Sequence, residues 1–333
     1  MIAVADHYYW LFNGPAAAPF YARAEQLFSK HGDEKNALHA KIGRLRSTAE
    51  SMSFVELSQI LDGYMQNPVV KGDKNLRLWC LIAKGYTDLE INYRKSKQDW
   101  LEAQQIANEL GEKQWAARAS GELGLIGFLE GSPGRAARLI GGALLSTMTS
   151  GDTAGQIRFL ELIGRGFEEV NRHGEAMRFF NRALKLADSD RDLPLPFMAY
   201  EGKAQVLMAT GKPNDARALL QDALTKARAE QKHGHETQLL ILLASVAEKS
   251  ADNPHAIEYL ERARQLATGL NFYRMDADAT FELAKLYRDN GDLATAEARA
   301  SEGLCESARW RSLLCSAKYD HPRRPEGIAR THC

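Results

Sequence analysis

The 333-residue sequence lacks long hydrophobic stretches. It contains no uninterrupted run of about 18 apolar residues, which is the length that indicates a helix crossing a bilayer, so we expect no membrane span. The apolar start, residues 1–19, is short, carries Asp6 and His7 and has no leading basic residues. It is therefore a poor secretory signal, and we expect it to form the first helix.

The sequence also has no surplus of either charge. Lys plus Arg and Asp plus Glu both number 43, so the formal net charge is zero. Proteins that bind nucleic acids usually carry a basic surplus that displaces counterions from phosphates. The charge balance therefore argues against nucleic acid as a partner.

Cysteine is scarce, and its spacing matches no zinc site. The four cysteines are Cys80, Cys305, Cys315 and Cys333, and no close cysteine pair stands near a pair of histidines. Metal sites need such paired ligands. We expect reduced thiols in a cytoplasmic protein, with no metal and no cofactor.

The motifs of common enzyme classes are missing as well. No Walker loop, nucleophile elbow or zinc-protease motif occurs. The glycines of 121–131 lack the Lys-Ser/Thr that follows a phosphate loop, and His233 and His235 have no third ligand nearby. Glu168 and Glu169 are interpreted as members of ion pairs on a helix, because arginines lie beside them. We therefore expect no enzyme activity.

An internal repeat of 40 residues is present. Alanines stand at 136, 176, 216, 256 and 296. The residues seven positions later and twelve positions earlier are all small, and those four positions later are large in four of the five units. Offsets of four and seven lie on one face of a helix. Each unit thus predicts a helix, a turn rich in Gly, Asn and Pro, and a second helix, and such pairs bury their apolar faces by stacking.

These units resemble the tetratricopeptide repeat family. The best match is Ile163-Gly164-x2-Phe167 followed by Ala176-x3-Phe180-x2-Ala183-Leu184. The resemblance is strong over 112–304, although the units exceed the usual length of about 34 residues, as in bacterial regulatory arrays. It implies an all-α fold, a right-handed α-solenoid of about seven antiparallel helix pairs.

Three segments are expected along the chain. Residues 1–110 form degenerate helix pairs, and 111–305 form the regular repeats. Residues 306–333 form a capping helix near Ser307–Ala317, using Trp310, Leu313 and Leu314, followed by a disordered or atypical tail. An altered or truncated end of a longer array is the alternative interpretation of this last segment.

The resemblance also implies a concave binding groove lined by the first helix of each pair. Arginines at one end favour an acidic part of an extended or helical peptide, and methionines in the middle suit varied apolar partners. The alternative is that these charges only solvate the groove. The groove positions are Arg118, Arg158, Glu161, Arg165, Glu168, Met198, Glu201, Gln205, Met208, Gln238, Ser245, Lys285 and Arg288.

We therefore predict a protein–protein interaction scaffold that binds a peptide or helix, with no cofactor and no membrane partner. The alternative is the sensor or regulatory arm of a larger bacterial signalling protein whose effector domain is absent or separate. A repeat RNA binder of the pentatricopeptide type is disfavoured by the neutral charge and the 40-residue period.

Overall fold

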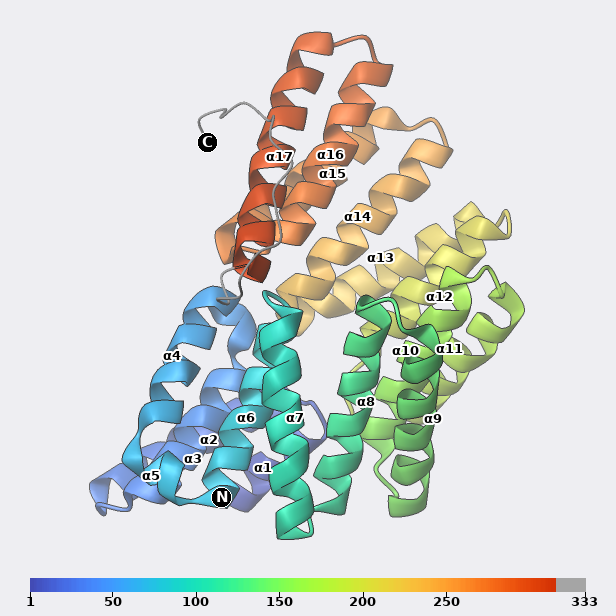
Figure 1. Cartoon of the computed structure of the whole chain (residues 1–333). Coiled ribbons are helices and arrows are strands. Elements are labelled where there is room, and N and C mark those ends of the chain that lie inside the picture. Colours follow the sequence, from blue (N-terminus) through green and yellow to red (C-terminus); the bar gives the residue numbers. More distant parts are fainter. Residues whose placement is uncertain (316–333) are drawn as a thin grey trace.

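The computed structural model describes residues 1–315, with only the backbone described over 309–315 (Figure 1). Within these residues the chain forms seventeen α-helices, one short 3-10 helix and no strand. The N-terminal part consists of α1 (Ile2–Trp10), α2 (Gly14–Lys30), α3 (Glu34–Ser47), the 3-10 helix η1 (Ala49–Ser51), α4 (Phe54–Gln66), α5 (Pro68–Gly72), α6 (Lys74–Leu89) and α7 (Tyr93–Leu110).

The repeat region is built of helices of similar length. They are α8 (Lys113–Leu129), α9 (Pro133–Ser150), α10 (Thr153–Glu169), α11 (His173–Ala187), α12 (Phe197–Ala209), α13 (Pro213–Ala229), α14 (His233–Lys249), α15 (Asn253–Leu270), α16 (Tyr273–Asp289) and α17 (Leu293–Cys315). Each even-numbered helix packs on the odd-numbered helix that follows it, and each pair packs on the next. Together with α2–α3 and α6–α7 this makes seven antiparallel pairs, which confirms the predicted all-α solenoid (Figure 1).

The 40-residue register corresponds to the packing. The five marker alanines lie on the second helices α9, α11, α13, α15 and α17, and all are buried. The ring of Phe180 occupies the space beside Gly164 of its own unit and Gly202 of the next. A Cβ atom added to Gly164 would lie 2.6 Å from Cε1 of Phe180. The recurring small residues are therefore required by close approach of neighbouring helices.

The turns repeat at half the period. Residues with a left-handed backbone occur every 20 residues over most of the repeat region, where they end one helix and admit the next. They are Gly111, Gly131, Gly151, Asn171, Gly211, Gln231, Ala251, Asn271 and Gly291. The series skips position 191, because the α11–α12 connection is longer, spans 188–196 and contains two prolines.

The solenoid curls until its N-terminal helices contact the later repeats. The carboxylate of Glu50 in η1 accepts a hydrogen bond of 2.8 Å from the amide of Gly234 at the start of α14. The rings of Phe54 and Phe272 stack with their centroids 5.3 Å apart. Figure 1 shows the N-terminal helices beside the lower end of α14. Segments more than 180 residues apart thus form one surface.

The C-terminal end differs from the expected capping arrangement. Helix α17 passes through residue 305 without a break, so residues 306–315 continue the second helix of the last pair. The side chains of Trp310, Leu313 and Leu314, and the predicted tail from 316 to 333, lie outside the described residues. The division of the chain at 110 and 305 remains a prediction.

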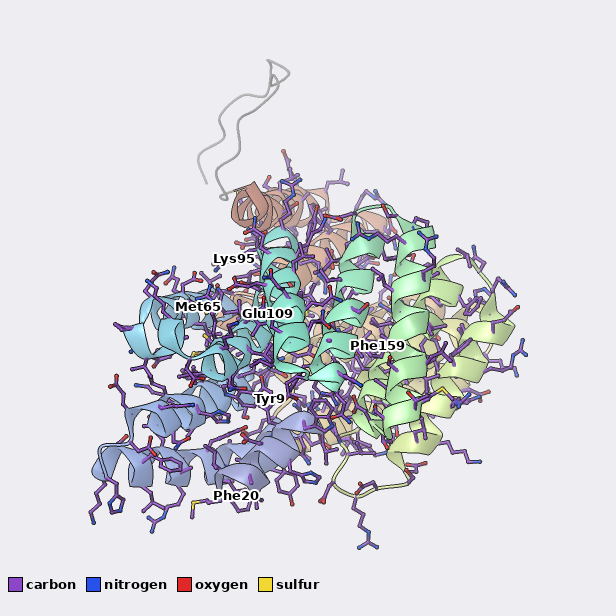
Figure 2. The ribbon with its side chains drawn as sticks, turned by 60° about the horizontal axis from the view of Figure 1, so that its bottom comes forward. Tyr9, Phe20, Met65, Lys95, Glu109 and Phe159 are labelled. Atoms are coloured by element: carbon purple, nitrogen blue, oxygen red, sulfur yellow. The ribbon has the colours of Figure 1, made fainter. Side chains whose placement is uncertain are left out.

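No helix between residues 1 and 315 is both long and apolar enough to cross a membrane. Cys80 is a buried free thiol, and burial raises its pKa to about 12. Cys305 is disulfide-bonded, which corrects the expectation that all four cysteines are reduced. In Figure 2, Tyr9 belongs to the buried N-terminal core, whereas Phe20 on α2 is one of the exposed apolar side chains.

Candidate functional site

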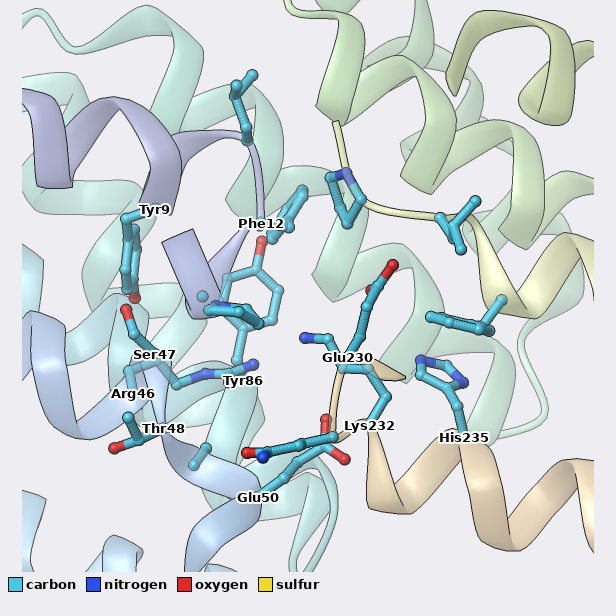
Figure 3. Close-up of a pocket in the computed structure, with 18 of the residues that line it drawn as sticks. Tyr9, Phe12, Arg46, Ser47, Thr48, Glu50, Tyr86, Glu230, Lys232 and His235 are labelled. Atoms are coloured by element: carbon cyan, nitrogen blue, oxygen red, sulfur yellow. The ribbon is translucent and has the colours of Figure 1, made fainter. Parts of the chain in front are cut away.

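The curled solenoid encloses a cavity of about 630 Å³ (Figure 3). One wall comes from α1, the α1–α2 connection, the end of α3, η1 and α6. The opposite wall comes from the α11–α12 connection and the α13–α14 turn, and α10 lies between the two. Pockets for small ligands commonly enclose about 300–1,000 Å³. The cavity is therefore the candidate binding site.

The α1–α2 corner shapes the first wall. Phe12 has a φ of 61°, a left-handed conformation that is rare for an aromatic residue, and its ring packs at a right angle on Tyr86 with centroids 5.6 Å apart. Gly14 at the start of α2 lies against the end of α3, where an added Cβ would be 2.5 Å from the carbonyl oxygen of Ser47. The missing side chain lets the two helices meet beside the cavity.

Polar side chains of the same wall are Tyr9, Arg46, Ser47 and Tyr86. The guanidinium carbon of Arg46 lies 5.5 Å from the ring centroid of Tyr86, within the range of a cation–π contact. Burial raises the pKa of Tyr9 and of Tyr86 well above the ordinary value. Both phenols therefore keep their protons and remain hydrogen-bond donors at neutral pH.

Three of the predicted groove residues, Arg158, Glu161 and Met198, line the cavity. Arg158 donates two hydrogen bonds of 3.0 Å to the carboxylate of Glu122, and its third nitrogen lies 3.2 Å from the sulfur of Met198. Glu122 is almost fully buried. This ion pair connects α8 and α10, and the sulfur contact extends the connection to α12.

Glu161 on α10 is a buried carboxyl with a single printed hydrogen bond. Its Oε1 accepts the amide proton of Ala199 at 3.0 Å. Burial raises the pKa of Glu161 to about 7, although the positive charge of Arg158 and the Ala199 hydrogen bond act in the opposite direction. The carboxyl is therefore expected to exchange its proton near neutral pH.

Glu201 is buried and paired with a histidine of the next unit. Nδ1 of His235 lies 2.8 Å from Oε1 of Glu201, and the imidazole stacks on Phe197 with centroids 4.9 Å apart. Burial acts to lower the pKa of His235, but the hydrogen bond to Glu201 and its negative charge outweigh that effect and raise the pKa. His235 is thus favoured as an imidazolium beside a carboxylate.

Arg118 does not lie on an accessible groove, and this expectation is corrected. Its side chain is 1% exposed, it pairs with Asp152, and its guanidinium carbon lies 3.5 Å from the ring centroid of Trp10. The aromatic side chain of α1 covers α8 at this point. A repeat register describes only contacts between repeats, so it gave no sign of this covering residue.

The other predicted groove residues lie outside the cavity lining. Arg165 hydrogen-bonds to Gln205 on the next first helix, and burial raises the pKa of the half-buried Glu168 against the positive charge of Arg165. Lys285 on α16 forms a 2.7 Å ion pair with Glu248. Met208, Gln238 and Ser245 are half-buried on α12 and α14, and Arg288 is exposed on α16.

Sequence reasoning missed the residues that close the cavity. The N-terminal wall follows no repeat pattern, so the register could not assign it. The segment 193–197, which forms much of the opposite wall, had a usable signal. Pro194 and Pro196 fall where the 20-residue series of turns is interrupted, and an interruption of this kind marks a longer loop.

No family model and no curated protein sequence matches the chain. Solved structures do share its architecture. A Rap protein complexed with Competence and Sporulation Factor superposes with a TM-score of 0.65 at 10% identity, over 93% of this chain and 98% of that one. NprR in complex with its cognate peptide NprX gives 0.63 at 13% identity, over 90% of each chain.

A third structure is a Signal Transduction ATPase with Numerous Domains that has a tetratricopeptide repeat sensor, from Pyrococcus horikoshii. It gives a TM-score of 0.51 at 13% identity, over 78% of this chain and 40% of that one. At such identities the similarity concerns the fold. The chain has the tetratricopeptide-like fold that its repeats predicted.

Proposed function

We propose that this tetratricopeptide-like solenoid is a cytoplasmic interaction scaffold that binds a peptide along its inner surface. The observation that carries the proposal is that Arg158, Glu161 and Met198, predicted from the repeat register, line one cavity. The fold is shared with NprR, whose structure contains its cognate peptide. Peptide binding at this surface is therefore the function that we infer for the chain.

Arg165 is the residue expected to hold an acidic side chain of the peptide. Arg158 is already neutralised by the carboxylate of Glu122. Arg165 has only the neutral amide of Gln205 as its hydrogen-bond partner and forms no ion pair within the described residues. Its guanidinium can therefore accept a carboxylate in the paired geometry that arginine favours. Met208, three residues beyond Gln205 on α12, offers an adaptable apolar contact.

The test begins with a peptide recovered from the native source by affinity capture and mass spectrometry. Arg165→Glu is expected to weaken its binding by about tenfold or more, because a favourable charge pair becomes a repulsive one. Arg182→Glu is the matched control, since Arg182 is exposed on the second helix α11. Equal binding by wild type and Arg165→Glu would contradict the proposal.

Arg158→Glu is a less direct variant, because it leaves Glu122 buried without its partner. Its binding data are interpretable only if its unfolding midpoint matches that of the wild type. Arg165→Glu avoids this difficulty, since Arg165 is half-buried and its partner is uncharged.

The second candidate function is the sensor arm of a larger signalling protein. The observation in its favour is the similarity to the sensor-bearing ATPase, of whose length this chain spans 40%. An effector domain encoded in the adjoining reading frame would favour this function over that of a free-standing scaffold.

A further inference from the structure

The N-terminal wall of the cavity carries four buried polar atoms without a hydrogen-bond partner in the described part of the chain. They are the hydroxyl oxygens of Tyr9, Ser47 and Tyr86 and Nε of Arg46. The two tyrosines are 8% and 9% exposed, so water reaches them poorly. Buried polar groups in native proteins are almost always satisfied, and a cluster of exceptions in one cavity indicates a missing partner.

All four groups can donate a hydrogen bond, and the guanidinium can do nothing else. Arg46 forms no ion pair within the described residues and contacts only the ring of Tyr86. The other cavity arginine, Arg158, is paired with Glu122. The wall therefore presents one uncompensated guanidinium flanked by phenol donors, which together match an anionic acceptor.

The rest of the cavity limits the kind of anion. Leu11, Ile157 and Leu193 give it an apolar lining, which suits a hydrocarbon body. Glu50 and Glu230 also line it, and Figure 3 shows Glu230 on the side opposite Arg46. These carboxylates disfavour a doubly charged group such as phosphate. A single negative charge beside Arg46, on an apolar body, fits the cavity best.

We propose that this cavity binds a hydrophobic carboxylic acid, with its carboxylate at Arg46, Tyr9 and Tyr86 and its apolar body against Leu11 and Leu193. A free small acid and the carboxyl end of a hydrophobic peptide present the same chemistry. The cavity volume, about 630 Å³, is that of a small-ligand site. The inference does not rest on the peptide contacts at Arg158 and Arg165, because it uses a different wall.

Isothermal titration calorimetry on the full chain tests the proposal. The probes are 4-phenylbutyrate and octanoate, each compared with its neutral amide. The acids are expected to bind at least about tenfold more tightly than the amides, because only the acids can pair with the guanidinium. Absence of binding by both acids at millimolar concentration, or equal binding of acids and amides, would overturn the proposal.

Variants assign the site. Arg46→Gln is expected to lose about tenfold in acid affinity while leaving amide affinity unchanged, and Tyr86→Phe about threefold or more. Arg44→Gln is the control on the same helix, since Arg44 pairs with Glu25 and does not line the cavity. Thermal melts monitored by circular dichroism show whether each variant is folded. Unchanged acid binding by a folded Arg46→Gln protein would also overturn the proposal.

A further arm distinguishes the two sources of the carboxylate. An acetylated tetrapeptide ending in phenylalanine is titrated with a free and with an amidated carboxyl end. Tighter binding of the free-ended tetrapeptide than of 4-phenylbutyrate assigns the carboxylate to a peptide, and the reverse order assigns it to a small acid. Acid binding retained in Arg165→Glu shows that this site and the proposed peptide contact stand or fall separately.

Discussion

The guanidinium of Arg118 donates two hydrogen bonds to the carboxylate of Asp152, at 2.8 Å and 2.6 Å, in a site where both side chains are at most 1% exposed. The same carboxylate accepts the amide proton of Gly155 and so caps the start of α10. Trp10 covers the guanidinium. One buried ion pair therefore connects the first helix, a regular repeat and the turn into the next repeat.

Replacing Arg118 is expected to be costly. Arg118→Ala leaves Asp152 buried without a counter-charge and should lower the free energy of unfolding by about 3–5 kcal/mol. Urea denaturation measures the change. Arg172→Ala is the comparison, since Arg172 belongs to an exposed ion pair with Glu175 and its loss should matter little. Similar losses in the two variants would contradict the assigned role of the buried pair.

Two glycines of α10 provide a paired test of the repeat packing. Gly164→Ala places a methyl group against the ring of Phe180 and should destabilise the fold by about 1–3 kcal/mol. Gly166→Ala meets no atom within 4 Å and should instead stabilise the helix by about 0.5–1 kcal/mol. Opposite shifts in the denaturation midpoint are expected. Shifts of the same sign would count against the close approach at Gly164.

The stability of the protein should depend on pH through Glu161. Its folded pKa of about 7 exceeds the ordinary value of 4.5, so the unfolded state loses this proton first as pH rises. Stability from this group therefore falls between about pH 4.5 and 7. Glu161→Gln removes the titration, so the variant should gain up to about 3 kcal/mol relative to wild type between pH 4 and 8.

The control for this prediction is Glu169→Gln, because Glu169 is exposed on the same helix. Chemical denaturation is followed at several pH values for the three proteins. A constant difference between Glu161→Gln and wild type across the range would refute the assignment. The comparison is insensitive to any pH-independent cost of the substitution.

The stacked rings of Phe54 and Phe272 should be energetically coupled. Phe54→Leu and Phe272→Leu shorten both partners while keeping apolar side chains. A double-mutant cycle is expected to give a coupling energy of about 0.5–1.5 kcal/mol, the usual value for an aromatic pair. Phe54→Leu with Phe180→Leu serves as a pair whose rings form no such stack, and its effects should be nearly additive. A vanishing coupling between Phe54 and Phe272 would mean that the two ends touch without stabilising each other.

The repeated part of the fold was predictable because its packing is local. Ala176 and Phe180 lie on one face of α11, and Gly164 supplies the space that the ring of Phe180 fills. The rule recurs every 40 residues, so the sequence alone predicted the helix pairs and the order of their stacking. Turn residues such as Asn171 and Gly211 were predictable for the same reason, since left-handed backbone favours Asn and Gly.

The site was only partly predictable. Arg158 and Met198 reach the cavity because they occupy inner positions of the register. Arg46, Tyr9 and Tyr86 join them through the curl of the whole solenoid, which depends on small rotations summed over many pairs. No local pattern encodes that sum. The covering of Arg118 by Trp10 was hidden for the same reason.

The contact between Glu50 and Gly234 has a consequence for how the chain denatures. In an open array each unit touches only its neighbours, and terminal units melt first while the middle persists. Here the two extremities of the spiral hold each other, so neither is a free end from which melting can begin. Denaturant should therefore dissolve the described helices in a single sharp transition, and detaching the amino-terminal helices should broaden it into successive steps.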